Sequence, residues 1–487
     1  METDVGMSLS MVKDWVLIDK SQKFILIANL DRLESFFWKK IFKIYGPFIM
    51  QIDKTSFSDI AIFHAEEEFS IFHKLNFTRT VGGKAWLHKF FTEPHSDLKK
   101  ILGTQKVIRT LMEHVDEWPV DISNGTVLVM DKFMDYPLDP VPENPNALNS
   151  LFYEMLHSED YSMVKYSVSH FADFYRGLKN IASLLQDLDL PIGIKLYIDR
   201  IVGLLKEPPL QKLAETEKGK RFSTRENLYY GYQLRGRYKT GTLELIEIYS
   251  RLDAWYSMAL AVKTYGLCFP EFVEQETPLV DANGLYHLLI PTPVPYDLQM
   301  NPEHNFVFLT GANMAGKSTL IKSIGAAVFL AHIGMGVPAV NMRLTLFDGL
   351  LSNINVVDNI AKGESFFFNE VQRIKNTIEK INTGKKWLVL IDELFKGTNV
   401  QDAMKCSLTV VKGLIKIKNS LFILSTHLYE IGEELKKYPN ISFRFFETNV
   451  KDDQLEFTYQ LKEGISNDRI GYVILKREKV VDMLEKL

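Results

Sequence analysis

The stretch that most constrains what this chain can fold into is residues 306–320, FVFLTGANMAGKSTL. An apolar, strand-like run is followed by the spacing G-x-x-x-x-G-K-S and then by apolar residues at helical intervals. The two glycines let backbone N–H groups wrap a phosphate, Lys317 can reach β- and γ-phosphate oxygens, and Ser318 can hold Mg²⁺. The helix that starts here adds the positive end of its dipole. The spacing therefore predicts a phosphate-binding loop. We expect it to bind ATP through these residues: Gly311, Ala312, Asn313, Met314, Ala315, Gly316, Lys317, Ser318 and Thr319.

Length and composition indicate a multidomain globular protein of a reducing compartment. The chain has 487 residues and a net charge of −4, so any nucleic-acid binding needs a local basic patch. Its two cysteines, Cys268 and Cys406, lie far apart and offer neither a disulfide framework nor a zinc spacing. The sequence predicts no signal peptide and no membrane span, and we expect a cytoplasmic protein.

The chain divides into three regions by composition. Residues 1–50 contain short aromatic runs and receive no role, residues 51–275 read as a mostly α-helical domain, and residues 276–487 read as an α/β domain that opens with Pro-rich edge strands. Helical periodicity favours a helix within residues 57–75, a helix that restarts after a break at Gly82-Gly83, and further helices at 98–115, 151–188 and 243–265. Prolines between 118 and 147 predict a connector without a long helix.

Residues 212–239 form the one basic segment that is interleaved with tyrosines. Its cations are Lys212, Lys218, Lys220, Arg221, Arg225, Arg235, Arg237 and Lys239. Such a segment favours contact with nucleic acid, but a solvated tip between two helices has the same composition. Both interpretations stay open at this point.

Acidic residues and a histidine follow the next strands of the α/β domain. The apolar run 387–391 ends in Asp392-Glu393, and the run 421–425 is followed by Thr426-His427. Parallel strands bring their carboxyl ends to one edge, so we expect Asp392 to support Mg²⁺ together with Ser318, Glu393 to orient the attacking water and His427 to sense the γ-phosphate. Period-two alternation around residues 451–453 predicts a final hairpin. This order of motifs is typical of ABC-class ATPases.

Several of these motifs resemble those of the MutS mismatch-repair family. GANMAGKST resembles the family's phosphate loop GPNMGGKST, LVLIDELFKGT resembles its acidic strand, STH at 425–427 matches its histidine motif, and GISNDRIGYVIL is similar to its closing motif. GESFFFNE at 363–370 resembles the segment in which a serine reaches the partner subunit's nucleotide, a role that the resemblance assigns to Ser365. Upstream, TRTVGGKAWLHKFFTEP and SRLDAWYSMALAVKTYGLCFPEF resemble the helices of the MutS core or lever domain.

The resemblance implies a fold and a mode of action. It implies a C-terminal α/β P-loop ATPase domain of the ABC class with a parallel-rich sheet, preceded by a mostly α-helical lever domain with a reduced clamp tip at 212–239. It also implies ATP and Mg²⁺ as ligands, a head-to-head homodimer, and DNA as a partner of the lever helices and of the 212–239 segment. Because few residues of this sequence precede residue 55, we do not expect it to contain the family's mismatch-reading domain. Ala315, Glu364 and Phe395-Lys396 also depart from the family's Gly, Arg and Gly-Arg.

Two main functions compete. The first is a MutS-type ATPase whose nucleotide-driven dimer rearranges a DNA-contacting lever. The second is a nucleotide-switched scaffold of the same fold that binds protein partners or branched DNA without reading mismatches. A third, a transporter-coupled ATPase, is disfavoured by the fused helical domain and by the absence of the glycine-rich transporter signature. No membrane partner is expected.

Overall fold

A computed structural model describes residues 49–354, 366–451, 454–466 and 480–484. The chain forms two units, Met1–Ile49 and Met50–Leu487, and the architecture below is that of the second. No helix in the described residues is long and apolar enough to cross a membrane.

The second unit contains a seven-stranded sheet in the order β1-β7-β8-β9-β5-β10-β11. Its strands are β1 (Gln51–Ile52), β5 (Phe306–Thr310), β7 (Gly349–Asn353), β8 (Trp387–Asp392), β9 (Ser420–Ser425), β10 (Ile441–Lys451) and β11 (Gln454–Glu463). All neighbours pair in parallel except β10 and β11, which form the predicted antiparallel hairpin. The prediction of a parallel-rich α/β sheet is confirmed.

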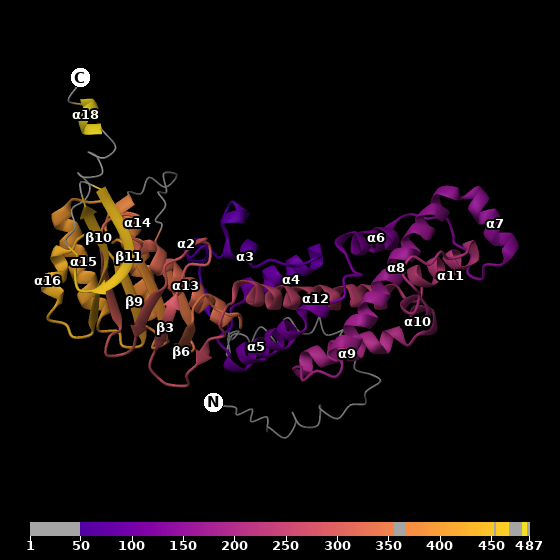
Figure 1. Cartoon of the computed structure of the whole chain (residues 1–487), viewed down its shortest axis with the longest axis horizontal. Helices are drawn as coiled ribbons and strands as arrows, with labels where there is room; N and C mark the ends of the chain where they lie inside the picture. The colour runs from indigo at the N-terminus through magenta and orange to yellow at the C-terminus, as the bar shows by residue number, and fades with distance from the viewer. Residues whose placement is uncertain (1–48, 355–365, 452–453, 467–479, 485–487) are drawn as a thin grey trace, which may run out of the picture. The chain divides into compact units, whose positions relative to one another are not determined.

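Helices cover the central strands on both faces, as their continuous burial requires. In β5, Val307 and Leu309 belong to the core that includes α13 (Lys317–His332), whereas Phe306 and Phe308 belong to the core on the opposite face. That opposite core includes side chains of three helices (Figure 1): α14 (Phe366–Ile381), α15 (Val400–Leu414) and α16 (Glu430–Leu435). Because the central strands carry apolar side chains on both faces, the polar side chains of the site lie where these strands end.

A smaller sheet in the order β2-β6-β3-β4 lies before and after the phosphate loop in sequence. It consists of β2 (Glu271–Phe272), β3 (Val280–Leu285), β4 (Tyr296–Met300) and β6 (Asn341–Leu344). The expected strands within 276–305 are therefore β3 and β4.

The helical part is built around two long helices, α8 (Ser158–Leu185) and α12 (Lys239–Tyr265). Helices α4 (Val81–Thr92) and α5 (Leu98–Glu113) pack along α12. Around α8 pack α6, α7, α9, α10 and α11, with these bounds: Asn124–Asp135, Ala147–Leu156, Ile192–Leu205, Pro208–Ala214 and Thr224–Arg235. The predicted helices at 98–115, 151–188 and 243–265 are confirmed, the second as the closely spaced pair α7 and α8.

Three local expectations differ from the structure. Residues 57–75 are not one helix but α2 (Lys54–Asp59), a short 3₁₀ turn and α3 (Ile71–Lys74), because Ala61 turns the chain with a φ of 57°. The supposed connector 118–147 contains α6, which fits between Pro119 and Pro137 and starts at a capping box on Ser123.

The third difference is at Gly82-Gly83, which begin α4 instead of breaking it. Thr80 caps the helix, and both glycines lie against α12: a Cβ at Gly83 would stand 2.0 Å from a carboxylate oxygen of Asp253. The glycines therefore permit close helix packing rather than a turn. Strand β1 and helix α2 contact β7, so residues 51–59 add to the large sheet. The domain boundaries at 50/51 and 275/276 stay predictions.

Asp253 of α12 anchors the start of α4. Its carboxylate is fully buried and accepts hydrogen bonds from the Arg79 N–H at 3.0 Å, the Thr80 N–H at 2.9 Å and the Thr80 hydroxyl at 2.7 Å. A buried charge is tolerated when donors of this kind surround it. Removing it would leave those donors buried without partners.

We therefore expect Asp253→Ala to lower the free energy of unfolding by about 3 kcal/mol. Urea unfolding followed by far-UV circular dichroism measures the loss. Asp189→Ala is the control, because Asp189 is an exposed partner of Lys106 and its removal should leave the midpoint unchanged. Equal midpoints for the two variants would contradict the anchoring role.

Candidate functional site: a phosphate loop at the carboxyl edge of the large sheet

The predicted loop connects β5 to α13, as the sequence pattern requires. Gly311 and Gly316 have φ angles of 137° and 111°, a backbone region that side chains rarely adopt. A Cβ at Gly311 would also lie 3.2 Å from the Phe446 carbonyl oxygen of β10. Glycine is thus required at this position both by conformation and by space. The loop ends at the N-terminus of a long helix, which favours an anion.

Lys317 is buried and folds back over the loop. Its Nζ donates to the carbonyl oxygens of Gly311 at 2.8 Å and Ala312 at 2.9 Å. Burial lowers the pKa of Lys317, while the nearby carboxylates of Glu393 and Asp392 oppose that shift. The ammonium is therefore held at the centre of the loop with acidic groups close by, where it can meet phosphate oxygens.

Asp392 joins the loop to the ends of two strands. Its Oδ2 accepts from the Ser318 hydroxyl at 2.5 Å, and its Oδ1 accepts from the Ser425 hydroxyl at the end of β9. A hydroxyl and a carboxylate at this separation are hard oxygen donors of the type that Mg²⁺ prefers. The donor set therefore fits the predicted metal, and Ser318 and Asp392 lie together as expected.

Glu393 follows Asp392, and each of its carboxylate oxygens lies near a basic side chain. Oε1 lies 3.5 Å from His427 Nδ1, and Oε2 lies 3.4 Å from Lys396 Nζ. The hydrogen bond with His427 is the main reason that the pKa of Glu393 falls to about 2, and Lys396 and Lys317 add to the effect against burial. The same hydrogen bond raises the pKa of His427. The carboxylate is therefore ionised throughout the physiological range.

The backbone after β8 is strained where the acidic group is presented. Glu393 and Phe395 have φ angles of 64° and 60°, which cost a non-glycine residue on the order of 1–3 kcal/mol each. Phe395 is buried and packs against Phe367 with ring centroids 5.7 Å apart. Such packing offsets the strain at the position where the resembling family has glycine.

A residue that the sequence did not single out, Glu370 of α14, holds this strained loop. Its carboxylate is buried and accepts from the backbone N–H groups of Lys396 at 3.2 Å and Gly397 at 3.3 Å. Glu370 is the last residue of the 363–370 motif and lies in the first turns of α14, so this helix is bonded directly to the loop that carries Glu393. No periodicity signals this contact, because it joins segments that are separate in the sequence.

A cavity of about 620 Å³ opens beside the loop. Its polar wall includes Lys317, Ser318, Asp392 and Glu393. The cavity also has a mainly apolar and aromatic wall, which is formed by Ile290, Thr292, Val294, Tyr296 and Tyr459. Tyr459 of β11 is exposed and has a φ of 53°, so a strained backbone presents its ring. This wall was missed from sequence, because period-two alternation does not distinguish a pocket residue from a surface residue.

The other residues that were predicted to bind ATP lie in different places. Asn313 and Met314 line the cavity, whereas Ala312 and Ala315 are buried beneath the loop. Ser365, Glu364 and most of the closing motif lie outside the described residues.

The basic segment 212–239 is only partly available to a ligand. Arg235 donates to the Phe133 carbonyl oxygen at 2.9 Å, and Lys239 donates to that of Met134 at 3.0 Å. Tyr230 and Tyr238 are buried. The exposed cations are Lys212, Lys218, Lys220, Arg221, Arg225 and Arg237. Two of the segment's eight cations and two of its tyrosines therefore stabilise the helical part, and the other six cations are exposed.

The His427–Glu393 contact predicts a pH-dependent stability. Because the folded pKa of His427 lies above its ordinary value of 6.5, its contribution is complete below pH 6.5 and is lost as pH rises through the raised value. His427 is 57% exposed, so solvent screening limits the contribution to about 0.5 kcal/mol. The Glu393 contribution, by contrast, is lost only when pH falls from 4.5 towards 2.

We expect His427→Gln to lower the unfolding midpoint at about pH 6 and to match the unsubstituted protein at about pH 9. Urea unfolding at the two pH values provides the measurement. His304→Gln is a control, since His304 is exposed and has no acidic partner within the described chain. A difference that stays constant with pH would contradict the ion pair.

Comparisons with known proteins agree with the motifs. Residues 307–483 match the family model MutS domain V. The chain is 29% identical over 231 residues to the DNA mismatch repair protein MutS of Pseudothermotoga lettingae, a match that covers 47% of this chain and 28% of that protein. It is 32% identical over 183 residues to MutS of Aquifex pyrophilus, covering 38% and 21%. A match to the DNA mismatch repair protein msh3 of Aspergillus fumigatus has 26% identity over 238 residues and covers 47% and 21%. The matched part is less than a third of each relative.

Proposed function

We propose that this chain, a MutS-like member of the mismatch-repair family, binds and hydrolyses ATP and uses the nucleotide to change the geometry of its helical part. The observation that carries the proposal is the meeting of Lys317, Ser318 and Asp392 with Glu393 around one cavity at the carboxyl edge of the sheet. The cavity has a size suited to a nucleotide.

In this proposal the triphosphate lies over the loop and the nucleoside lies against the apolar wall. Backbone N–H groups between Gly311 and Thr319 face the phosphates, and Lys317 exchanges its bonds with loop carbonyls for bonds with β- and γ-oxygens. The rings of Tyr296 and Tyr459 offer stacking surfaces for the base. Ser318 and Asp392 would hold Mg²⁺, which would neutralise developing charge on the phosphates.

Glu393 is the group that we assign to the attacking water. Its low pKa means that it acts as an ionised acceptor that orients and polarises the water. His427, within reach of Glu393, would respond to the γ-phosphate. Glu370 keeps the strained loop in register, so a rearrangement of α14 would also move Glu393.

A head-to-head homodimer completes the proposal. Ser365 directly precedes α14 in the sequence, and we propose that it reaches the nucleotide of the partner subunit. Its position before α14 would then connect dimer closure to Glu393 through Glu370. ATP binding would close the dimer, and hydrolysis would reopen it. A cytoplasmic setting agrees with Cys268 and Cys406, which are both free.

Two substitutions separate binding from turnover. Lys317→Ala should weaken ATP binding at least about 100-fold, since it removes a charge-assisted contact to phosphate. Glu393→Gln should bind ATP normally and lower kcat by about 100-fold to 1,000-fold. Fluorescent-nucleotide titration and phosphate release measure the two quantities. Glu433→Gln, on the exposed surface of α16, is the control. Normal turnover by Glu393→Gln would refute the water assignment, and normal binding by Lys317→Ala would refute the loop.

DNA is the proposed partner of the helical part, through the lever helices and the exposed cations of 212–239. The alternative, a nucleotide-switched scaffold for protein partners or branched DNA, is favoured by the structural use of Arg235 and Lys239. The two functions differ in salt dependence, because each neutralised phosphate releases counterions.

If DNA binds here, affinity should fall steeply with salt for matched, mismatched or branched duplexes. Replacing Lys218 and Arg221 with Gln should then reduce the slope of log affinity against log salt by about 0.9 for each phosphate that is no longer neutralised. Fluorescence anisotropy at several NaCl concentrations tests this, with the exposed Lys405→Gln on α15 as the control. If none of the duplexes binds or stimulates ATP hydrolysis, DNA is ruled out as the partner.

A further inference from the structure

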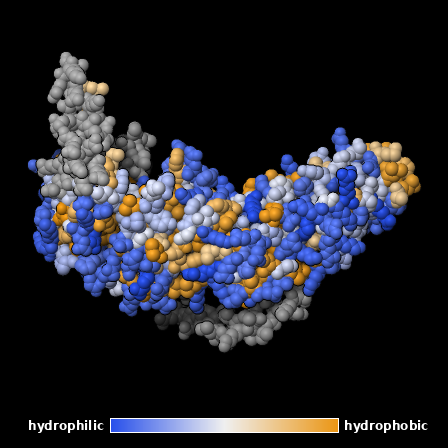
Figure 2. All heavy atoms as spheres, viewed as in Figure 1, coloured by the Kyte–Doolittle hydropathy of each residue, from blue (hydrophilic) through white to orange (hydrophobic). Residues whose placement is uncertain are grey.

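Helix α7 carries its apolar face towards solvent. Its large apolar side chains recur at the spacing i, i+3, i+4, i+7 and i+8, and each exposes at least 54% of its surface: Leu148, Leu151, Phe152, Met155 and Leu156. The residues that α7 buries, Ser150 and Tyr153, lie on the opposite side. Figure 2 shows the apolar residues gathered over this helix. In a surface helix such a stripe normally faces the core.

The helix is held firmly even though its apolar stripe has no partner within the described chain. Asn146 and Asn149 form a capping box, and the Tyr153 hydroxyl donates to the Asp139 carbonyl oxygen at 3.1 Å. Glu154 accepts from the Thr224 hydroxyl at 2.9 Å, which attaches α7 to α11. The stripe is therefore presented by a fixed element, and an exposed apolar patch of this kind marks an interaction surface.

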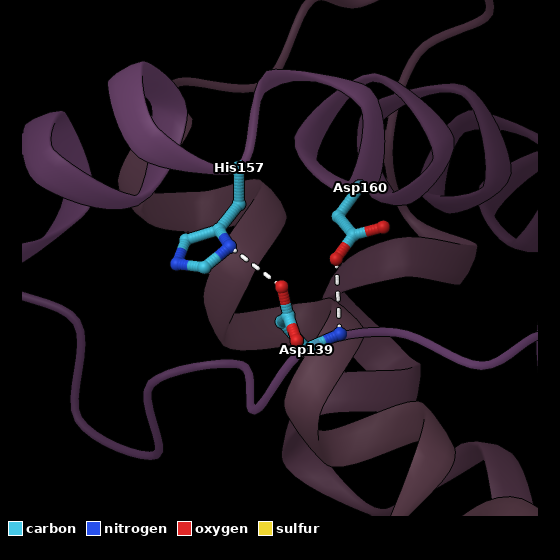
Figure 3. Close-up of side chains that lie close together, drawn as sticks. All are labelled: Asp139, His157 and Asp160. Carbon is cyan, nitrogen blue, oxygen red and sulfur yellow. Dashed lines mark hydrogen bonds and ion pairs between the residues drawn. The ribbon is translucent and has the colours of Figure 1, made fainter.

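The chain segment that contains α7 is acidic. Residues 136–160 contain no lysine or arginine and five carboxylates: Asp139, Glu143, Glu154, Glu159 and Asp160. Figure 3 shows two of them with His157, whose Nδ1 lies 2.7 Å from Asp139 Oδ2, while Asp160 accepts from the Asp139 N–H at 2.9 Å. Within the described part of the chain, none of the five forms an ion pair with a lysine or arginine.

The cavity next to the start of α7 is lined by basic and acidic groups together. Lys212, Lys220 and Arg225 line a cavity of about 1010 Å³ beside Asn144 and Asn146, and Glu215, Glu217 and Glu226 line the same cavity. Residues 136–160, which contain the stripe, therefore contribute negative charge and no lysine or arginine. This charge disfavours DNA phosphates and would place like charges together if two copies of α7 met.

We propose that α7 is a docking surface for a partner protein, and that the partner presents an amphipathic helix whose apolar face is flanked by lysine or arginine. The leucine, phenylalanine and methionine side chains of α7 would bury against the apolar face of that helix. The carboxylates of residues 136–160 would pair with its cations and set its orientation. This surface is separate from the ATP cavity, so the proposal does not depend on nucleotide chemistry.

A synthetic amphipathic helix of about 18 residues, with leucine on one face and lysine on its flanks, is the probe. We expect it to bind the full chain in fluorescence anisotropy, more weakly at about 300 mM NaCl than at about 50 mM. The double variant Phe152→Glu and Met155→Glu should weaken binding at least 10-fold, equivalent to about 1.4 kcal/mol. Leu196→Glu, at an exposed leucine of α9, is the matched control and should bind normally.

The charge requirement has its own test. Asp139→Asn with Asp160→Asn should weaken binding about threefold and reduce its salt dependence. The same peptide with glutamate in place of lysine should not bind. Circular dichroism checks that each variant keeps its helix content.

Four results would overturn the proposal. Two concern the peptide: the lysine peptide does not bind, or the glutamate peptide binds equally well. The third is that the chain self-associates in sedimentation and that the double variant abolishes this self-association. The fourth is that the chain binds vesicles of anionic lipid and that the double variant abolishes this binding. The last two would assign the surface to a second copy or to a membrane.

Discussion

The structure depends on the burial of α13. Apart from residues near its start and the partly exposed Lys322, this helix is buried along its length, and its N-terminus forms the end of the phosphate loop. At its other end, the His332 ring is fully buried between Phe347 and His95: Nε2 accepts from the Phe347 N–H at 3.2 Å, and Nδ1 donates to the His95 carbonyl oxygen at 2.7 Å. Burial lowers the pKa of His332 to about 4, so the ring is neutral. One rigid element therefore contacts both the phosphate loop and the α4–α5 connection of the helical part.

Packing around α13 leaves little freedom to absorb a displacement. Cβ atoms at Gly325 and Gly334 would meet Leu390 and Thr104 at 2.6 Å. Close-packed interiors transmit strain. A shift of α13 on nucleotide binding would be passed to α5, which packs along α12. The same argument applies on the other face, where Glu370 bonds α14 to the strained backbone of the Glu393 loop.

The sequence predicted which side chains lie together at the carboxyl edge of the large sheet, because strand ends fix their positions. Lys317, Ser318, Asp392 and His427 follow β5, β8 and β9, and a parallel sheet brings these ends together. Glu370 and Tyr459 could not be found in this way, since their positions depend on packing between distant segments. Gly82-Gly83 was misread because a glycine that permits close packing and one that breaks a helix look alike in sequence.

The helical part shows why composition predicts a surface poorly. In the 212–239 segment, Arg235 stacks on Phe133 and donates to its carbonyl oxygen, so its charge serves the fold. In α7 the opposite holds: leucines and a methionine at core-like spacing face solvent, because Tyr153 anchors the other side. Periodicity indicates that a helix has an apolar face, but it does not indicate whether that face points to the core or to solvent. The orientation of the apolar face is set by the few tertiary contacts that hold the helix. For that reason we infer the type of partner from the orientation of α7 and from the carboxylates of residues 136–160. The number of lysines and arginines in the sequence is a weaker guide.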